Sequence, residues 1–557
     1  MQNITPQNIN SRKFETHPKT GSLNARFVGA REGVSGSCTW LYHTSSDTQF
    51  LVDCGAFQGA DEIPNQQDFP FDPSALRFVL LTHAHMDHCG RLPKLIEEGF
   101  QGKVYATQAT RDLTLTMLQD AAKIGGADDL SHINNIDWSV IDADQGFKWG
   151  RPIPLADDLR VSFLRSSHIL GASLVSITWK SKDNADRTIC FSGDTGGQVK
   201  GNSYLPLMKN GQTPFLSSDY IVTEATYGNR TRDRSYMNSK IRTDLLSGII
   251  SRTVFEKKGR VIIPAFSLHR TQELIADIWS CLRAFDGETR HADKNLNVLI
   301  DSPLGRKVTE VYEPHLFSLS PNGKYRYLNP ELSAHLGLSN DEIHDGFKTL
   351  ISGEPLRVAK NSTITFSSSD PKGRQSIHDK LRDNQIVLAS SGMCDFGPMK
   401  AYLKHVNNDP KNTIIITGFQ SSGTAGASLL QSKSNSIGYD QNCAEVVDMS
   451  CYYSAHADKS QLLDFVFEAE QDQKKKVSAT VFINHGTREA KHELAEAIKT
   501  RADKKIATDR SVHRVLTSNA LWFDLDNGEY IDESSEVAYL KEENERLKKE
   551  MLVYKKK

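Results

Sequence analysis

Thr82-His-Ala-His-Met-Asp-His-Cys-Gly-Arg-Leu-Pro93 is the stretch that decides the fold, and it follows an apolar run typical of a buried strand. It places four metal-binding side chains within six residues, in the pattern HxHxDH. On a loop between a strand and a helix, His83 and His85 can point toward one ion, while Asp87 and His88 turn toward a second position nearby. Neutral imidazole and carboxylate groups are ligands that Zn²⁺ and similar divalent ions prefer. The stretch therefore predicts a metal site at the end of a strand.

Three further candidate ligands lie at the ends of later predicted strands. His168 lies in Ser-Ser-His-Ile-Leu-Gly, Asp194 in Ser-Gly-Asp-Thr-Gly and His485 in Ile-Asn-His-Gly. Each residue alone is more typical of a core or turn position than of a ligand. Their placement at the carboxyl ends of strands, behind the HxHxDH loop, favours metal binding, and the two oxygens of Asp194 can bridge two ions.

The composition predicts a globular protein of several structural units. The chain has 557 residues, of which 38% are hydrophobic and 24% charged, so a packed core is feasible and wholesale disorder is excluded. No apolar run approaches the ~18 residues of a membrane span, and the polar N-terminus offers no secretory segment. Eight scattered cysteines without a CxxC pair favour reduced thiols and a cytoplasmic protein. A net charge of −2 neither supports nor excludes a nucleic-acid partner.

The pattern of apolar residues changes along the chain. Residues 22–219 contain short β runs with interleaved turns and helices. Residues 220–438 show alternating strands and helices, which predicts parallel βα units. A further strand is predicted at 477–484, followed by a helix at 489–501.

The last segment of the chain resembles a short coiled coil. Between Val537 and Tyr554 the apolar residues follow heptad spacing, with Asn544 at an a position and leucines at d positions. Fewer than three heptads are marginal alone, so a solvated helical tail and a contact in a homodimer both remain open.

The order of motifs resembles the metallo-β-lactamase superfamily, and specifically its β-CASP branch of nucleic-acid-processing proteins. The five motifs of the superfamily match Asp53, residues 83–88, His168, Asp194 and His485. The motifs that the branch adds match Glu224 in Thr-Glu-Ala-Thr-Tyr, His456 in Ser-Ala-His-Ala-Asp, and His485 again. The resemblance covers about residues 24–516.

The resemblance implies an α/β fold: an αβ/βα sandwich of two facing sheets with an inserted β-CASP α/β domain. The expected division of the chain is an N-terminal arm at 1–21, a metallo-β-lactamase domain at 22–219 and 439–520, a β-CASP domain at 220–438, and the coiled-coil-like tail at 535–557.

The resemblance also assigns roles to the motif residues. His83, His85 and His168 are expected to hold one zinc, and Asp87, His88 and His485 the other, with Asp194 bridging. Asp53 is expected to act from behind the ligands by orienting their loop. Manganese is the alternative metal, because nitrogen and oxygen ligands do not distinguish it decisively from zinc.

The family chemistry implies hydrolysis of a phosphodiester bond by a hydroxide held between two zinc ions. His456 is expected to protonate the departing sugar oxygen, with the Glu224 carboxylate raising the pKa of its imidazole and orienting it. Asp87 is a second candidate for proton transfer, from the attacking water.

Three loops of the expected insertion resemble phosphate-binding loops, because small residues at a helix start let backbone N–H groups approach an anion. Arg270 lies in the first loop, Ser391 and Gly392 in the second, and Gly423 and Thr424 in the third. We expect these residues to contact the RNA backbone. His269, which precedes Arg270, differs from many relatives.

Taken together, these features predict a zinc-dependent ribonuclease. Histidine at the third β-CASP motif is typical of RNA-acting members, and the chain resembles prokaryotic relatives of the endonuclease of the eukaryotic cleavage and polyadenylation machinery. The alternatives are a DNA nuclease of the same branch, a small-molecule metallo-hydrolase of the superfamily, and a non-catalytic scaffold. Endonuclease and 5′–3′ exonuclease action both remain open.

Overall fold

The computed structural model describes most of the chain between residues 14 and 531. Outside the described part lie residues 1–13, 59–62, 144–146, 198–203, 210–217, 287–295, 321, 369–374, 422, 435–442, 469–477, 507–509 and 532–557. The coiled-coil-like tail and the predicted homodimer contact fall in the last of these ranges and stay predictions. Among the described residues, no helix combines the length and the apolar character that a membrane crossing requires.

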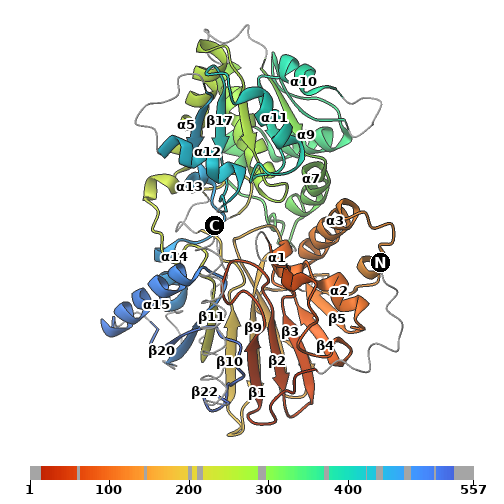
Figure 1. The fold of residues 1–557 in the computed structure, drawn as a ribbon, viewed down its shortest axis with the longest axis vertical. Helices are drawn as coiled ribbons and strands as arrows, with labels where there is room; N and C mark the ends of the chain where they lie inside the picture. Colours follow the sequence, from red (N-terminus) through yellow and green to blue (C-terminus); the bar gives the residue numbers. More distant parts are fainter. Residues whose placement is uncertain are drawn as a thin grey trace, which may run out of the picture.

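Two facing sheets form the lower half of the molecule (Figure 1). The first has the order β22-β21-β1-β2-β3-β4-β5-β6. Its strands are β1 (Leu23–Phe27), β2 (Thr39–His43), β3 (Thr48–Val52), β4 (Leu76–Leu80), β5 (Lys103–Ala106), β6 (Asp137–Val140), β21 (Phe523–Asp524) and β22 (Glu529–Tyr530). The second has the order β20-β19-β11-β10-β9-β8-β7. Its strands are β7 (Ile153–Ala156), β8 (Leu159–Arg165), β9 (Ser173–Lys180), β10 (Asp186–Phe191), β11 (Tyr220–Thr223), β19 (Ala479–Ile483) and β20 (Val512–Thr517).

Alternating apolar residues of both sheets meet in one core, in which Phe50 and Phe78 of the first sheet pack with Phe163 and Phe482 of the second. Helices cover the outer faces. On the first sheet these are α1 (Met86–Cys89), α2 (Leu92–Glu97), α3 (Gln108–Ile124) and α4 (Ser131–Asn134), and on the second they are α14 (Lys459–Phe467) and α15 (Arg488–Asp503). The lower half is therefore the predicted αβ/βα sandwich.

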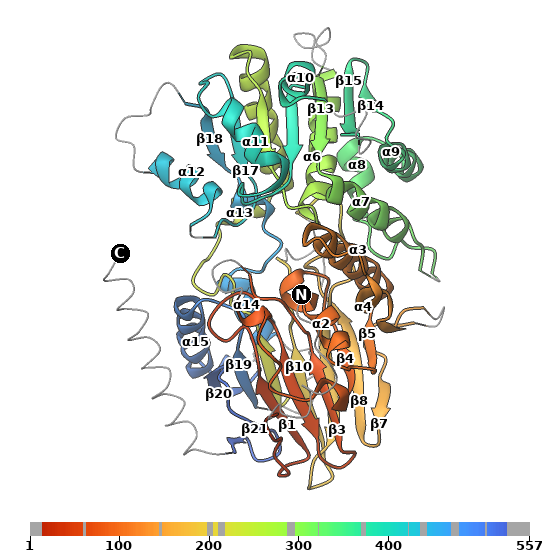
Figure 2. The same ribbon diagram turned by 45° about the vertical axis from the view of Figure 1, so that its right-hand side comes forward.

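A third, mostly parallel sheet forms the upper half, in the order β14-β15-β13-β16-β12-β17-β18 (Figure 2). Its strands are β12 (Val261–Pro264), β13 (Leu296–Asp301), β14 (Leu356–Ala359), β15 (Ser362–Phe366), β16 (Ile386–Ala389), β17 (Thr413–Ile416) and β18 (Glu445–Asp448). Its helices are α5 (Ser239–Ser251), α6 (Arg270–Asp286), α7 (Pro303–Leu316), α8 (Leu332–Leu336), α9 (Asn340–Ser352), α10 (Ile377–Asp383), α11 (Gly397–Val406), α12 (Ala425–Ser434) and α13 (Ser450–Tyr453). The central strands are continuous apolar runs because both faces of the sheet are covered.

The chain crosses between the two halves twice. β11 pairs in parallel with β10 and β19 in the second sheet, so the chain leaves the sandwich only after Thr223. β18 still pairs with β17 in the third sheet, so the chain returns after Asp448. The first crossing lies about four residues later than the expected boundary at 220, and the second about ten residues later than the expected boundary at 439.

The halves meet where the carboxyl ends of the upper strands face the sandwich. After β12, the buried Glu273 carboxylate accepts a hydrogen bond at 2.8 Å from the N–H of Leu207, in the segment that links β10 to β11. Further along the same seam, the ring of Phe419, after β17, lies 6.4 Å from the ring of Tyr227, after β11. The loops that follow β12, β16 and β17 therefore lie on the sandwich side of the third sheet.

Candidate metal centre

The HxHxDH stretch connects β4 to the short helix α1. It is tied to the loop after β3, because the Cys54 N–H donates to the His88 carbonyl at 2.8 Å and the Ala56 N–H donates to the Met86 carbonyl at 2.8 Å. A Cβ atom on Gly55 would lie 1.7 Å from the carbonyl oxygen of Asp87, so only glycine allows this approach. The loop after β3 thus supports the backbone that carries the four candidate ligands.

The first group of candidate ligands consists of His83, His85, His168 and Asp194, whose donor atoms lie within 4.8 Å of one another. His85 Nδ1 lies 3.1 Å from His83 Nε2 and 3.0 Å from His168 Nε2. Asp194 Oδ2 lies 3.5 Å from the Nε2 atoms of His83 and His168. Three imidazoles and one carboxylate therefore converge on one point.

The second group consists of Asp87, His88, Asp194 and His485. His88 Nε2 lies 3.2 Å from His485 Nε2 and 3.2 Å from Asp194 Oδ1, and His485 Nε2 lies 3.3 Å from Asp87 Oδ2. Asp194 belongs to both groups, one oxygen facing each. All seven predicted ligands are thus brought together from four separate segments.

The charges of the first group suit a cation, whereas the Asp194 carboxylate outweighs burial and raises the pKa of His88 and of His485, so these two imidazoles would lose a proton on binding metal. Burial lowers the pKa of His85 to about 3 and holds the pKa of His168 well below its ordinary value, so both imidazoles are neutral at neutral pH. Burial alone would raise the pKa of Asp194, but the His485 and His88 imidazoles outweigh it and hold the pKa well below the ordinary range. Neutral imidazoles and ionised carboxylates are the forms that bind metal.

An unpartnered oxygen tests whether a metal fits. Asp194 Oδ1 is buried and accepts no hydrogen bond among the described residues, although His88 Nε2 lies 3.2 Å from it. An ionised oxygen without a partner is costly in a protein interior, whereas a divalent ion at this point would satisfy it. The residues present fit two divalent ions, one for each group.

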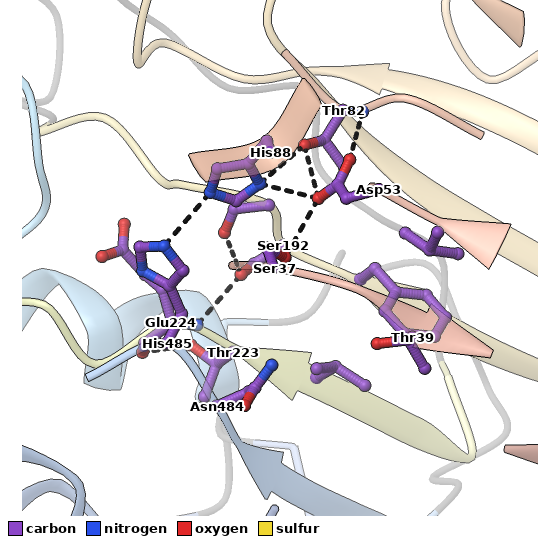
Figure 3. A pocket seen from close by; sticks show the side chains of 14 residues that line it. Ser37, Thr39, Asp53, Thr82, His88, Ser192, Thr223, Glu224, Asn484 and His485 are labelled. Carbon is purple, nitrogen blue, oxygen red and sulfur yellow. Dashed lines mark hydrogen bonds and ion pairs between the residues drawn. The ribbon is translucent and has the colours of Figure 1, made fainter. Parts of the chain in front are cut away.

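Asp53 lies directly behind His88 (Figure 3). Its carboxylate accepts hydrogen bonds from the Thr82 N–H at 2.8 Å and the Thr82 hydroxyl at 3.0 Å, and it lies 2.7 Å from His88 Nδ1. A proton on Nδ1 leaves His88 Nε2 with a free lone pair toward Asp194. Asp53 therefore fixes the tautomer and direction of a candidate ligand.

We expect Asp53→Asn to weaken divalent metal binding by about 10- to 100-fold. Asparagine tolerates the left-handed backbone of this position, where φ is 61°, yet it can place an N–H donor opposite the N–H of His88. Competition with a chromogenic chelator measures the affinity. The control is Asp47→Asn, also at positive φ, where the carboxylate only accepts a hydrogen bond from Tyr42. Equal affinities of wild type and Asp53→Asn would contradict the orienting role.

Glu224 and His456 form a pair beside the two ligand groups. Glu224 follows β11, and its Oε1 accepts hydrogen bonds from the Thr195 N–H at 2.6 Å and the Thr195 hydroxyl at 3.0 Å. His456 Nδ1 lies 3.3 Å from Glu224 Oε2 and 4.0 Å from Asp194 Oδ2. Burial lowers the pKa of His456, but the Glu224 carboxylate outweighs it and raises the pKa to about 9. The imidazole is therefore held as a proton donor, with Nδ1 engaged and Nε2 left for another group.

The loop that carries His456 is fixed on both sides. Asp458 caps α14 in a reciprocal capping box with Gln461. On the other side, the carbonyl oxygen of Ala455 lies 3.0 Å from His168 Nδ1. The Ala455 carbonyl thus connects the loop that carries His456 to the candidate ligand His168.

Thr195 and Asp458 hold Glu224 and His456 in place, and sequence reasoning missed both. Thr195 is adjacent to Asp194 and Asp458 lies two residues after His456, so a threonine beside Asp194 and an acidic residue before a helix were the available signals. The contact of His168 with a backbone carbonyl left no signal in the sequence.

The predicted phosphate contacts divide into two kinds. Ser391, Gly392, Gly423 and Thr424 lie in two adjacent loops after β16 and β17, which are joined by a hydrogen bond from the Gly426 N–H to the Met393 carbonyl at 3.1 Å. Arg270 is 6% exposed, and its guanidinium lies 5.3 Å from the centre of the Tyr453 ring. Its buried Nε and Nη1 atoms have no hydrogen-bond acceptor among the described residues, and the expected phosphate contact stays a prediction.

Three family models match consecutive parts of the chain. The metallo-beta-lactamase superfamily matches residues 31–224, the Beta-Casp domain residues 271–429, and the Zn-dependent metallo-hydrolase RNA specificity domain residues 444–508. The first contains six of the seven candidate ligands, and the last contains His456 and the seventh, His485.

Curated relatives match over most of the chain. Ribonuclease TTHA0252 of Thermus thermophilus is 29% identical over 79% of this chain and 89% of its own length. Transcription termination factor FttA of Methanosarcina mazei is 25% identical over 88% of this chain and 71% of its own. Cleavage and polyadenylation specificity factor subunit 3-I of Arabidopsis thaliana is 24% identical over 79% of this chain and 57% of its own.

Proposed function

Because the chain belongs to the metallo-β-lactamase superfamily and carries its Beta-Casp and RNA-specificity domains, we propose that it is a ribonuclease that hydrolyses RNA phosphodiester bonds at a dinuclear zinc centre. Relatives named as ribonucleases support a hydrolase that acts on RNA. The observation that carries the proposal is the position of the Glu224–His456 pair, 4.0 Å from the carboxylate that both ligand groups share. An acid beside a two-metal site suits cleavage of a phosphodiester bond.

The proposed centre divides the seven candidate ligands between two ions. His83, His85 and His168 would hold the first, Asp87, His88 and His485 would hold the second, and Asp194 would contribute to both. When bound, two such ions supply positive charge that acidifies water and neutralises a phosphoryl oxygen. Zinc is the proposed ion and manganese the alternative, and elemental analysis of the purified protein distinguishes them.

The protein side chains supply the proton transfers. Asp87 has its pKa lowered despite burial, because His485 donates to it, so it stays ionised and accepts a hydrogen bond from the attacking water. His456 donates its Nε2 proton to the departing sugar oxygen, and Glu224 stabilises the imidazolium before this transfer. Cleavage by this route is the same reaction at an internal bond and at an RNA end, so endonuclease and 5′–3′ exonuclease action both fit.

Three observations favour RNA over DNA. The segment that contains His456 matches a domain described by its RNA specificity, and relatives over most of the chain are named as ribonucleases. His485 supplies the histidine that is typical of RNA-acting members at the third β-CASP motif. A DNA nuclease remains the runner-up, because the metal geometry is the same for both substrates.

The proposal is tested with end-labelled RNA and DNA strands of identical sequence, incubated with metal-loaded wild type and Asp87→Ala. We expect wild type to cleave the RNA and the variant to lose that activity, because Asp87 belongs to the second ligand group. Product mapping on the same gels separates internal cleavage from removal of end nucleotides. Cleavage of DNA alone, or hydrolysis of a small thioester without cleavage of either strand, would contradict the proposal.

A further inference from the structure

A line of aromatic rings leads from His456 to the surface of the upper half. The Tyr227 ring lies 5.9 Å from the His456 ring in an edge-on arrangement, and the Phe419 ring lies 6.4 Å beyond it, also edge-on. Tyr227 follows β11 and Phe419 follows β17, so the line crosses from the sandwich to the third sheet. It starts at the proposed proton donor and ends in solvent.

Packing in the hydrophobic core does not account for the position of Phe419, because this large apolar residue is exposed. Phe419 is 38% exposed, whereas its neighbours Thr417 and Gly418 are buried. The loop itself is well anchored: the Thr417 hydroxyl donates to the Pro264 carbonyl, and the Gln420 amide donates to the carbonyls of Gly392 and Gly418. The fold thus holds the phenyl ring at the surface on a fixed loop.

Arg230 adds a positive charge to this line. Its guanidinium lies 5.5 Å from the centre of the Tyr227 ring, and the residue is exposed. Its backbone is fixed, because its N–H donates to the Tyr227 carbonyl and its carbonyl accepts from the Lys459 N–H at the start of α14. Within the described part of the chain, no carboxylate forms an ion pair with Arg230, so its charge is available to an anion.

Flat aromatic side chains beside a fixed cation match the chemistry of single-stranded RNA. Unpaired bases stack on aromatic rings without regard to base identity, and arginine binds the phosphates between them. We propose that the Phe419 ring stacks on the base next to the scissile phosphate, with Tyr227 supporting it edge-on, and that Arg230 binds a neighbouring phosphate. This subsite rests on the proposed ribonuclease function and makes its substrate single-stranded RNA at the point of cleavage.

The stacking part of the proposal is tested with three substitutions of one residue. We expect Phe419→Ala and Phe419→Leu to raise the half-saturating RNA concentration by about 10- to 100-fold while the rate at saturation changes little. Phe419→Trp should retain the wild-type value, because it keeps a flat ring. Ile124→Ala, at an 82% exposed position at the end of α3, controls for loss of surface apolar area. Full binding by the leucine variant would overturn stacking.

A set of RNAs with one abasic nucleotide tests where the base lies. With wild type, one abasic nucleotide next to the cleaved bond should raise the half-saturating RNA concentration by the same factor as Phe419→Ala does. With Phe419→Ala, that RNA should raise the half-saturating concentration no further. An equal abasic penalty in wild type and variant would overturn the proposed position.

The phosphate part is tested by salt dependence. Arg230→Gln should reduce the slope of log affinity against log salt by about 0.7, the value for one phosphate contact on a single strand. An unchanged slope would overturn this part. These results are separable from the proposed function, because wild type that cleaves no RNA contradicts the function, whereas normal cleavage with unchanged variants contradicts only the subsite.

Discussion

We expect His456→Ala to lower the rate of RNA cleavage by about 10²- to 10⁴-fold while the protein keeps its bound metal. The residue stands outside the two ligand groups, yet its Nδ1 lies 3.3 Å from Glu224 Oε2, which favours the protonated imidazole. Alanine removes the proton donor and leaves all seven candidate ligands unchanged. The loss should therefore appear in kcat at saturating RNA, with metal content measured by elemental analysis on the same sample.

Two further variants separate proton donation from a structural effect. Glu224→Gln keeps an oxygen that can accept from Thr195 but removes the negative charge beside His456, so its rate should fall between wild type and His456→Ala. The matched control is His344→Ala on α9, which removes a histidine paired with Glu313 of α7 in the upper half. A His456→Ala protein that cleaves RNA at the wild-type rate would contradict the assignment.

Local sequence was sufficient for the parts of the site that depend on a single loop. His83, His85, Asp87 and His88 lie within six residues on a strand-to-helix turn, so their convergence follows from chain geometry alone. His168, Asp194 and His485 are far apart in sequence and were placed by motif order. Their distances of 3.0–3.2 Å to His85 and His88 result from the position of β8, β10 and β19 in one sheet.

Features that depend on contacts between distant segments of the chain could not be predicted. Arg270 opens a helix after a strand, as a phosphate contact would, but its burial against Tyr453 is decided by α13, 180 residues later in the chain. The contact of Tyr227 with Phe419 likewise joins two loops 192 residues apart. Neither contact has a periodic or motif signal, because each joins segments that only tertiary packing brings together.

The boundaries of the inserted domain also depend on contacts between distant segments of the chain. The alternation of strands and helices begins near residue 220, but β11 at Tyr220–Thr223 is a short apolar run that fits either sheet. Its parallel pairing with β19, which lies more than 250 residues later, assigns it to the sandwich. Composition alone therefore locates the crossing only to within a few residues.

The largest loss of metal is expected for Asp194→Asn, which should remove both ions and abolish RNA cleavage. Asp194 is the only residue that belongs to both ligand groups among the described residues, and each of its oxygens faces a different group. An asparagine can offer one neutral oxygen and must turn an N–H donor toward the other group. Elemental analysis should find about two ions per wild-type chain and nearly none in the variant.

The matched comparison is Asp87→Asn, because Asp87 belongs to the second group only and His83, His85 and His168 remain intact in the first. This variant should keep about one ion, so the two carboxylates give different stoichiometries. Thermal unfolding with and without added zinc provides a second measurement: zinc at 100 times the dissociation constant stabilises wild type by about 2.7 kcal/mol per site, and Asp194→Asn should show no such gain. Since each protein is compared with itself, any change in intrinsic stability cancels. If Asp194→Asn retained two ions, or if both variants lost the same number, the shared carboxylate would not be the centre of the site.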